Sequence, residues 1–184
     1  MHASRITLLP IIALGLIAAA LLAACNGDID DPDISSNLVA VAAFNPTSAC
    51  VDVDGEGVDT NGDGTVDTQT FTSVQQTVTL DSRMRGSASS NLNDVIFNQV
   101  TIDYQMTAGG VPPQRTETIT VTVPAGGTAD VDVTTVLGAD IPTYFSLNSR
   151  GNIQLTFRGH DIAGNPATAV GWTAVEPATV CTGN

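Results

Sequence analysis

The chain of 184 residues contains no lysine and six arginines, against nineteen aspartates and glutamates, so its formal net charge is −13. A surface of this sign repels phosphate backbones and anionic lipid headgroups, and it attracts divalent cations. We therefore exclude nucleic acid as a partner. The absence of lysine also excludes Schiff-base catalysis.

Histidine is also scarce, with two residues in the chain. One of them, His160, stands next to Asp161, but no G-x-S-x-G motif accompanies it. A single histidine outside the N-terminal segment also argues against a zinc site. We expect no catalytic residue and no enzymatic activity. A remote alternative is a hydrolase that uses His160 or the carboxylates of Asp52 and Asp54.

Aromatic residues make up 4% of the chain, which limits the platforms available for stacking a glycan. Most fall within expected strands: Phe44, Phe71, Phe97, Phe157 and Trp172. Tyr144 and Phe145 instead lie in segment 134–145, which Pro142 interrupts and which we expect to be a loop with about one helical turn. These two residues either contact a glycan or close one open end of the fold.

The long apolar run of the sequence lies at the N-terminus. Arg5 precedes an apolar stretch that ends in Leu22-Ala23-Ala24-Cys25, which is typical of an export signal. The tetrad resembles the lipobox of bacterial lipoproteins. The resemblance implies that residues 1–24 are a signal peptide and that Cys25 is lipidated and anchors the protein to a membrane. The alternative is an uncleaved transmembrane anchor, because roughly nineteen apolar residues nearly span a bilayer.

This interpretation places the protein outside the cytoplasm, anchored by lipid to the cell envelope. Asn26 rather than aspartate follows Cys25, which favours the outer membrane, on either its periplasmic side or the cell surface. Residues 25–36 are acidic and nearly free of apolar side chains, so we expect a flexible tether. In an oxidising compartment Cys50 and Cys181 are expected to form a disulfide bond, and the alternative is two free thiols.

Strand-like patterns follow one another from residue 37 to the C-terminus. Leu38–Phe44 is a continuous apolar run, which predicts a strand buried on both faces. Apolar and polar residues then alternate in six further segments: 74–80, 96–106, 118–123, 129–133, 153–157 and 167–175. Within them Ile96, Val170, Trp172 and Ala174 are expected to face the core. About seven strands separated by turns predict an all-β, antiparallel sandwich over residues 37–184.

Ile153–Val175 resembles the last hairpin of bacterial immunoglobulin-like and fibronectin-III-like modules, in which an Asp-x-Ala-Gly-Asn turn joins the final two strands. The resemblance implies an immunoglobulin-like sandwich. Gly164 and Asn165 suit the positive φ that such a turn needs. Asp161 is expected to accept hydrogen bonds from backbone amides of the turn.

The segment with the clearest chemistry is 51–70, which we expect to form an acidic loop inserted between the first two strands. Its pattern D-x-N-x-D-G-x-x-D resembles the calcium loops of EF-hands, dockerins and thrombospondin type 3 repeats. The resemblance implies Ca²⁺ as cofactor, with five ligands: Asp59, Asn61, Asp63, the carbonyl of Thr65, and Asp67. Gly64 permits the bend, and Val66 occupies the apolar position that anchors such loops.

The loop departs from these families at its twelfth position, where Thr70 replaces an acidic residue, and no helix pattern flanks it. We expect the missing ligand to come from Asp52, Asp54 or Glu56, and two ions could share the cluster. Without a cation, so many carboxylates would repel one another in an ordered loop. The alternative is a soluble acidic turn with no metal, because Asn-Gly and Asp-Gly form turns readily.

Together these features predict a membrane-anchored, calcium-stabilised structural, adhesion or assembly module outside the cytoplasm. Its partner would be another envelope or surface protein, and we expect the threonine-rich segment Glu117–Val123 to form a sheet edge that is open to strand addition. The alternative function is a carbohydrate-binding or accessory subunit of a surface polysaccharide system.

Overall fold

The computed structural model describes residues 37–84 and 93–181, which belong to one compact unit, Asp33–Asn184. The expected signal peptide, Cys25 and the tether up to residue 36 lie outside the described residues. Strands dominate the secondary structure, so the prediction of an all-β fold is confirmed. Among the described residues, no helix is long and apolar enough to cross a membrane.

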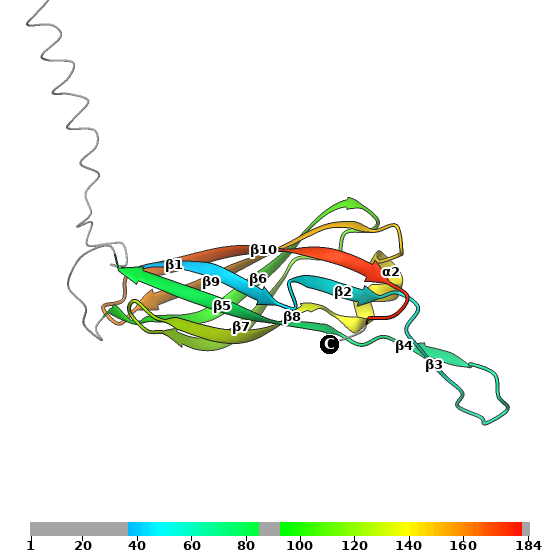
Figure 1. Cartoon of the computed structure of the whole chain (residues 1–184). Coiled ribbons are helices and arrows are strands. Elements are labelled where there is room, and N and C mark those ends of the chain that lie inside the picture. The colour runs from blue at the N-terminus through cyan, green and yellow to red at the C-terminus, as the bar shows by residue number, and fades with distance from the viewer. Residues whose placement is uncertain (1–36, 85–92, 182–184) are drawn as a thin grey trace, which may run out of the picture. The chain divides into compact units, whose positions relative to one another are not determined.

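Ten strands are described (Figure 1): β1 (Asn37–Asn45), β2 (Ser48–Asp52), β3 (Glu56–Val58), β4 (Thr68–Thr70), β5 (Val74–Met84), β6 (Val95–Ala108), β7 (Arg115–Val123), β8 (Thr128–Val136), β9 (Arg150–Asp161) and β10 (Pro166–Ala178). The sequence predicts seven of these and misses the short strands β2, β3 and β4. Between β8 and β9 lie a 3₁₀ turn, η2 (Gly138–Asp140), and a single helical turn, α2 (Ile141–Tyr144). The helical turn expected in segment 134–145 is therefore present, although Thr134–Val136 still belong to β8.

The long strands form two sheets. One has the order β1-β5-β8 and the other β2-β10-β9-β6-β7, while β3 and β4 pair only with each other. The prediction of a purely antiparallel arrangement is wrong at one place, because β2 runs parallel to β10. Strand β1 pairs with β5 in one sheet. After Pro46 and Thr47 the chain continues as β2, which belongs to the other sheet and runs in the same direction as β10.

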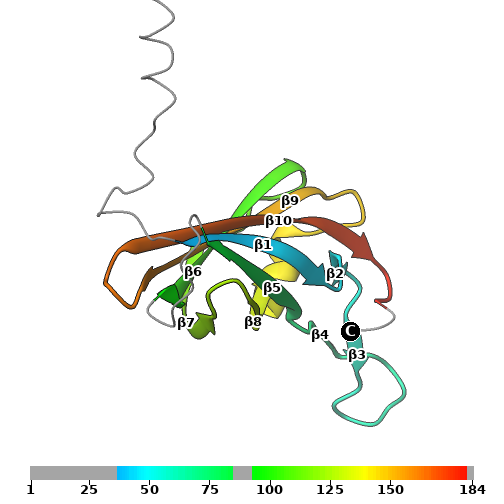
Figure 2. The ribbon, with the colours of Figure 1, turned by 60° about the vertical axis from the view of Figure 1, so that its left-hand side comes forward.

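A single hydrophobic core lies between the two sheets, whose layered arrangement is visible in Figure 2. Val78 and Leu80 of β5 are fully buried against residues of the other sheet. The rings of Phe97 and Phe157 meet edge to face, with their centroids 6.1 Å apart. Each large apolar side chain removed from water in this way stabilises the fold by about 1.5–3 kcal/mol.

The buried amide of Gln76 joins the two sheets through polar contacts. Its side-chain nitrogen Nε2 donates hydrogen bonds to the Pro46 carbonyl (2.7 Å) and to the Thr173 hydroxyl (3.0 Å). Thr173 in turn donates to the Thr47 carbonyl at 3.3 Å. These bonds hold the turn between β1 and β2 against β5 and β10.

Strand β10 presents the opposite face from the one predicted. Trp172 and Val170 are 46% and 44% exposed, and Ala174 is exposed too, whereas Ala169, Thr173 and Val175 are buried. Both alternating sets of this strand contain apolar residues, so the larger side chains do not identify the inner face. A one-residue change of phase moves every side chain to the other side of the sheet.

Two further orientations also differ from the prediction. Leu38 is 54% exposed while Val39 is buried, because the outer face of the β1-β5-β8 sheet meets solvent rather than a second layer. In β6 the buried residues are Val95 and Phe97 instead of Ile96. A bulge between Phe97 and Gln99 shifts the alternation by one residue at that point.

The turn between β9 and β10 has the predicted form. Asp161 is 2% exposed. Its carboxylate accepts hydrogen bonds from the backbone N–H of Asn165 (2.9 Å) and from the side-chain nitrogen Nδ2 of Asn165 (3.1 Å). Gly164 adopts a φ of 92°, which a side chain would disfavour. The structural role expected for Asp161 is confirmed.

The start of β1 and the β3–β4 pair lie at opposite ends of the domain (Figure 1). Asn37 pairs with Met84 at the end of β5, while β3 and β4 come just before Val74 at its beginning. Because β5 has 11 residues, the two ends are separated by roughly 35 Å.

Candidate functional site

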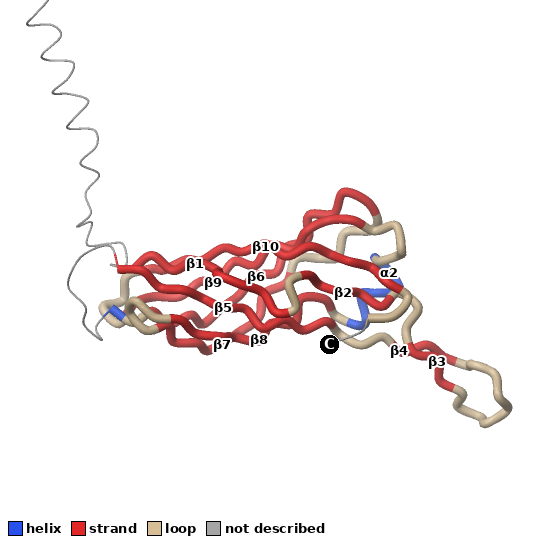
Figure 3. Tube along the Cα trace, viewed as in Figure 1, coloured by secondary structure: helices blue, strands red, loops and turns tan. Residues whose placement is uncertain are grey.

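Segment 56–70 forms a two-stranded hairpin that extends from the end of the domain, with an irregular loop at its tip (Figure 3). Glu56 pairs with Thr70 and Val58 with Thr68, and residues 59–67 make the loop. Every side chain from 56 to 70 is exposed. The expected insertion therefore exists, and its base is β-paired.

The predicted ligands at alternating positions cap the loop backbone in series. The Asp59 carboxylate accepts hydrogen bonds from the N–H groups of Gly62 (2.6 Å) and Gly64 (2.7 Å). Asn61 accepts from the Asp63 N–H at 2.9 Å, and Asp63 accepts from the Thr65 N–H at 2.8 Å and from the Thr65 hydroxyl. Short acidic or amide side chains readily capture the amide two residues ahead, so this spacing winds the chain tightly.

Asp67 closes the loop from its far side. One carboxylate oxygen accepts hydrogen bonds from the Thr60 N–H (2.9 Å) and the Thr60 hydroxyl (2.6 Å). The other lies 3.5 Å from the side-chain nitrogen of Asn61. Asp67 thereby brings the two halves of the loop together.

These hydrogen bonds lower the pKa values of all three loop aspartates below the ordinary value of 3.8. For Asp59 the largest cause is the N–H of Gly64. For Asp63 it is the side chain of Thr65, and for Asp67 it is the side chain of Thr60. Each bond favours the charged form. The loop therefore carries three carboxylates at neutral pH.

The donor chemistry of this loop suits Ca²⁺, which prefers carboxylate, amide and backbone oxygens. The arrangement fits less well: across residues 37–84 and 93–181, no three Asp, Glu, His or Cys side chains converge as metal ligands would. The carboxylates of Asp59, Asp63 and Asp67 are instead turned to amide and hydroxyl donors of the loop. Binding a cation would require these side chains to rotate towards a common centre.

Val66 was expected to anchor the loop to its surroundings. Its side chain is 63% exposed and lies over Gly57 on the neighbouring strand, where an added Cβ would come within 2.7 Å of it. The valine therefore packs within the hairpin itself. It does not join the core of the domain.

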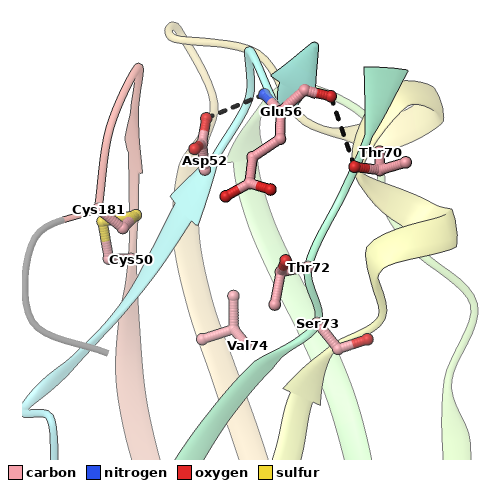
Figure 4. A pocket seen from close by; sticks show the side chains of 9 residues that line it. Cys50, Asp52, Glu56, Thr70, Thr72, Ser73, Val74 and Cys181 are labelled. Atoms are coloured by element: carbon pink, nitrogen blue, oxygen red, sulfur yellow. Dashed lines mark hydrogen bonds between the residues drawn. A yellow bond between two sulfur atoms is a disulfide. The ribbon is translucent and has the colours of Figure 1, made fainter. Parts of the chain in front are cut away.

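Asp52, Asp54 and Glu56 lie apart from the loop. Asp52 accepts hydrogen bonds from the N–H groups of Asp54 (3.1 Å) and Gly55 (3.0 Å). Asp52 and Glu56 line a cavity of about 190 Å³ at the base of the hairpin (Figure 4). Within the described segments, no hydrogen bond links these three residues to loop 59–67. The structure thus divides the eight predicted ligands into two groups.

Cys50 and Cys181 form a disulfide bond, as predicted, with an S–S distance of 2.03 Å. Both cysteines line the cavity beside Asp52 (Figure 4). The bond links β2 to the segment that follows β10 and so reinforces the parallel pairing of these strands.

The aromatic pair in segment 134–145 closes one end of the core. Phe145 is 7% exposed, and its ring meets Tyr104 edge to face with 6.4 Å between centroids. Tyr144 is half-buried and packs close to Gly110. Phe145 therefore has the closing role rather than that of a glycan contact.

Sequence reasoning missed the exposed indole of Trp172. The strand pattern Ala-Thr-Ala-Val-Gly-Trp-Thr-Ala-Val is compatible with either face being buried. The useful signal was the small size of Ala167, Ala169 and Gly171. Small residues at alternating positions leave room for close packing, and an added Cβ on Gly171 would come within 2.6 Å of Val41 of the other sheet.

Comparisons with known proteins add little. No family model matches the chain, and no curated protein matches it. The solution structure of a late embryogenesis abundant (LEA) protein matches over 96% of this chain and 97% of its own, with 12% sequence identity and a TM-score of 0.39. A similarity at this level carries no argument about fold family or function.

Proposed function

We propose that this protein is a membrane-anchored structural, adhesion or assembly module outside the cytoplasm, in which Ca²⁺ orders the β3–β4 hairpin. The observation that carries the proposal is the position of this hairpin, at the opposite end of the domain from Asn37 (Figure 1). A lipid on Cys25 would attach at the Asn37 end through residues 25–36, which reach about 40 Å when extended. The acidic hairpin would then lie at the end of the domain opposite the attachment point of the tether.

The arrangement of strands supports an immunoglobulin-like assignment of the domain. The first, second and fifth strands of that fold share one sheet, and the third, sixth and seventh share the other. Here β1, β5 and β8 form one sheet, while β6, β9 and β10 lie side by side in the other. Such folds host many functions, so the assignment by itself indicates a scaffold.

Strand β7 supports an assembly role. It forms one edge of the five-stranded sheet, as the sequence suggested for Glu117–Val123. Its outward side chains are exposed threonines at positions 116, 118, 120 and 122. Uncharged residues offer little protection against strand addition, so a strand of another envelope or surface protein could pair here.

The calcium proposal is supported by the residue types and spacing of loop 59–67 and by the ionised state of its aspartates. Hydrogen exchange of the purified full chain, measured by mass spectrometry on peptides from segment 56–70, tests it directly. We expect Ca²⁺ to slow exchange in this segment and Mg²⁺ to have little effect, since Mg²⁺ demands a more rigid octahedral site.

Two variants make the test specific. In Asp63→Asn, the calcium concentration needed to slow exchange should rise at least tenfold. Asp130→Asn is the matched control, because Asp130 binds the Thr79 hydroxyl on the outer face of β8, away from the hairpin. Identical exchange with calcium and with chelator would refute the calcium proposal.

The placement of His160 and Asp52 does not favour a hydrolase that combines these two residues in one site. His160 pairs with Pro166 at the beginning of β10, whereas Asp52 pairs with Ala178 at its end. Twelve residue steps along a strand separate these positions by about 40 Å. One catalytic site cannot include both.

A further inference from the structure

We infer that the outer face of the five-stranded sheet, centred on Trp172, binds a neutral glycan. This surface goes beyond the role proposed above and does not depend on calcium. Trp172 is the one tryptophan of the chain, and its indole is 46% exposed on a strand whose alternate side chains are buried. An exposed indole costs hydrophobic stabilisation, which a bound apolar surface would recover.

The register across the sheet places polar side chains beside the indole. Trp172 stands opposite Gln154 of β9, and Gln154 stands opposite Asp103 of β6. All three point away from the core, because the residues on either side of each along its strand are buried: Gly171 and Thr173, Ile153 and Leu155, and Ile102 and Tyr104. Neighbouring strands are about 4.8 Å apart, so the row spans roughly 10 Å, the length of a disaccharide.

The two neighbouring rows contain no charged side chain. Val170 stands opposite Thr156, which stands opposite Thr101. On the other side, Ala174 stands opposite Asn152. The face therefore offers amide and hydroxyl groups that both donate and accept hydrogen bonds, next to a narrow apolar strip on β10.

This combination matches a pyranose better than it matches a protein. A sugar ring has one face of C–H groups, which can cover an indole, and a rim of hydroxyls, which suits the amides of Gln154 and Asn152. A stable protein interface needs about 800 Å² on each partner with an apolar centre. The apolar strip here is one strand wide, with Val170, Trp172 and Ala174 as its members.

Charge narrows the class of glycan. The chain carries a net charge of −13, and Asp103 lies in the central row. Uronic acid or sulfated polymers would be repelled by this field. Neutral hexose or pentose polymers fit the face.

The fluorescence of Trp172 tests the inference without labelling, because it is the single tryptophan. The full chain is titrated with neutral β-linked hexasaccharides of glucose, mannose and xylose, each up to about 10 mM, and with oligogalacturonate as the acidic comparison. We expect at least one neutral oligosaccharide to change the emission saturably and the acidic one to bind at least tenfold more weakly.

Calorimetric titration of variants completes the test. Trp172→Ala should abolish binding, Trp172→Phe should retain part of it, and Gln154→Ala should weaken it about fivefold to tenfold. Asp63→Asn in the hairpin should bind the sugar unchanged, so this result is independent of the calcium proposal.

Two outcomes overturn the inference. One is the absence of saturable binding by every neutral oligosaccharide, or binding that Trp172→Ala leaves unchanged. The other is concentration-dependent dimerisation in sedimentation that disappears in Trp172→Ala, which would assign the face to self-association.

Discussion

The two-sheet body and the β3–β4 hairpin are built on opposite principles. In the body, residues far apart in sequence pack together, as Leu80 and Phe157 do in one core. In the hairpin every side chain is exposed, and the loop bonds connect residues between two and seven positions apart. The comparison shows that one chain can fix one region by apolar burial and another by local polar spacing.

The difference has an energetic consequence. A two-stranded hairpin without a buried face is marginally stable at best. Its connection to the body depends on close backbone packing at Gly55, which has a φ of 64° and where an added Cβ would meet the carbonyl oxygen of Thr70 at 2.6 Å. We therefore expect global stability to depend on the body and local order to depend on the aspartates.

Removal of the disulfide should have the largest effect on stability. The bond spans 131 residues, and a closed loop of this length stabilises the folded state by about 4–5 kcal/mol in the chain-entropy model. The double variant Cys50→Ser/Cys181→Ser should lower the free energy of unfolding by that order, measured by urea denaturation under non-reducing conditions.

Chemical reduction of the parent protein is the control for this variant, and it should give the same loss. A loss below about 1 kcal/mol would contradict the prediction and would mean that the parallel pairing of β2 with β10 holds these ends without the bond.

Truncation of the core should have the next largest effect. Phe157 is fully buried, so Phe157→Ala should destabilise the protein by about 3–5 kcal/mol through lost transfer energy and a residual cavity. Val66→Ala in the hairpin, at a side chain that is 63% exposed, should change the free energy of unfolding by less than about 0.5 kcal/mol. Similar losses for the two variants would refute the division between body and hairpin.

The sequence predicts the body well where one set of alternating residues is clearly apolar. In β9 the residues at 153, 155 and 157 are apolar and their neighbours are polar, and the predicted phase is confirmed. In β10 both sets contain apolar residues, and the phase depends on the close approach of Gly171 to Val41 across the core. The local signal of this phase is the small size of Ala167, Ala169 and Gly171, while the contact that requires it comes from another strand.

The candidate site divides in the same way. The spacing of Asp59, Asn61 and Asp63 is a local signal, and it predicts a tightly wound loop because each side chain reaches an amide a few residues ahead. The placement of Asp52 and Glu56 depends on where the hairpin leaves the body, beside the disulfide. That Asp52, Asp54 or Glu56 completes the ligand set of the loop stays a prediction.

The smallest expected effect is a pH response that distinguishes the two regions. The pKa values of Asp59, Asp63 and Asp67 are lowered, so their contribution to hairpin order is complete above the ordinary value of 3.8 and is lost as the pH falls below it. In the body, burial raises the pKa of Tyr104 from 10.0 to about 12, so its contribution is present below pH 10 and is lost as the pH rises towards 12.

Amide spectra should thus show the signals of Gly62 and Gly64 losing dispersion on acidification before those of core strands, because apolar core contacts do not titrate. In Asp59→Asn the acid response of these glycines should shrink, since an amide cannot be protonated in this range. Simultaneous loss of hairpin and core signals in the parent would instead mean that the two regions unfold as one unit.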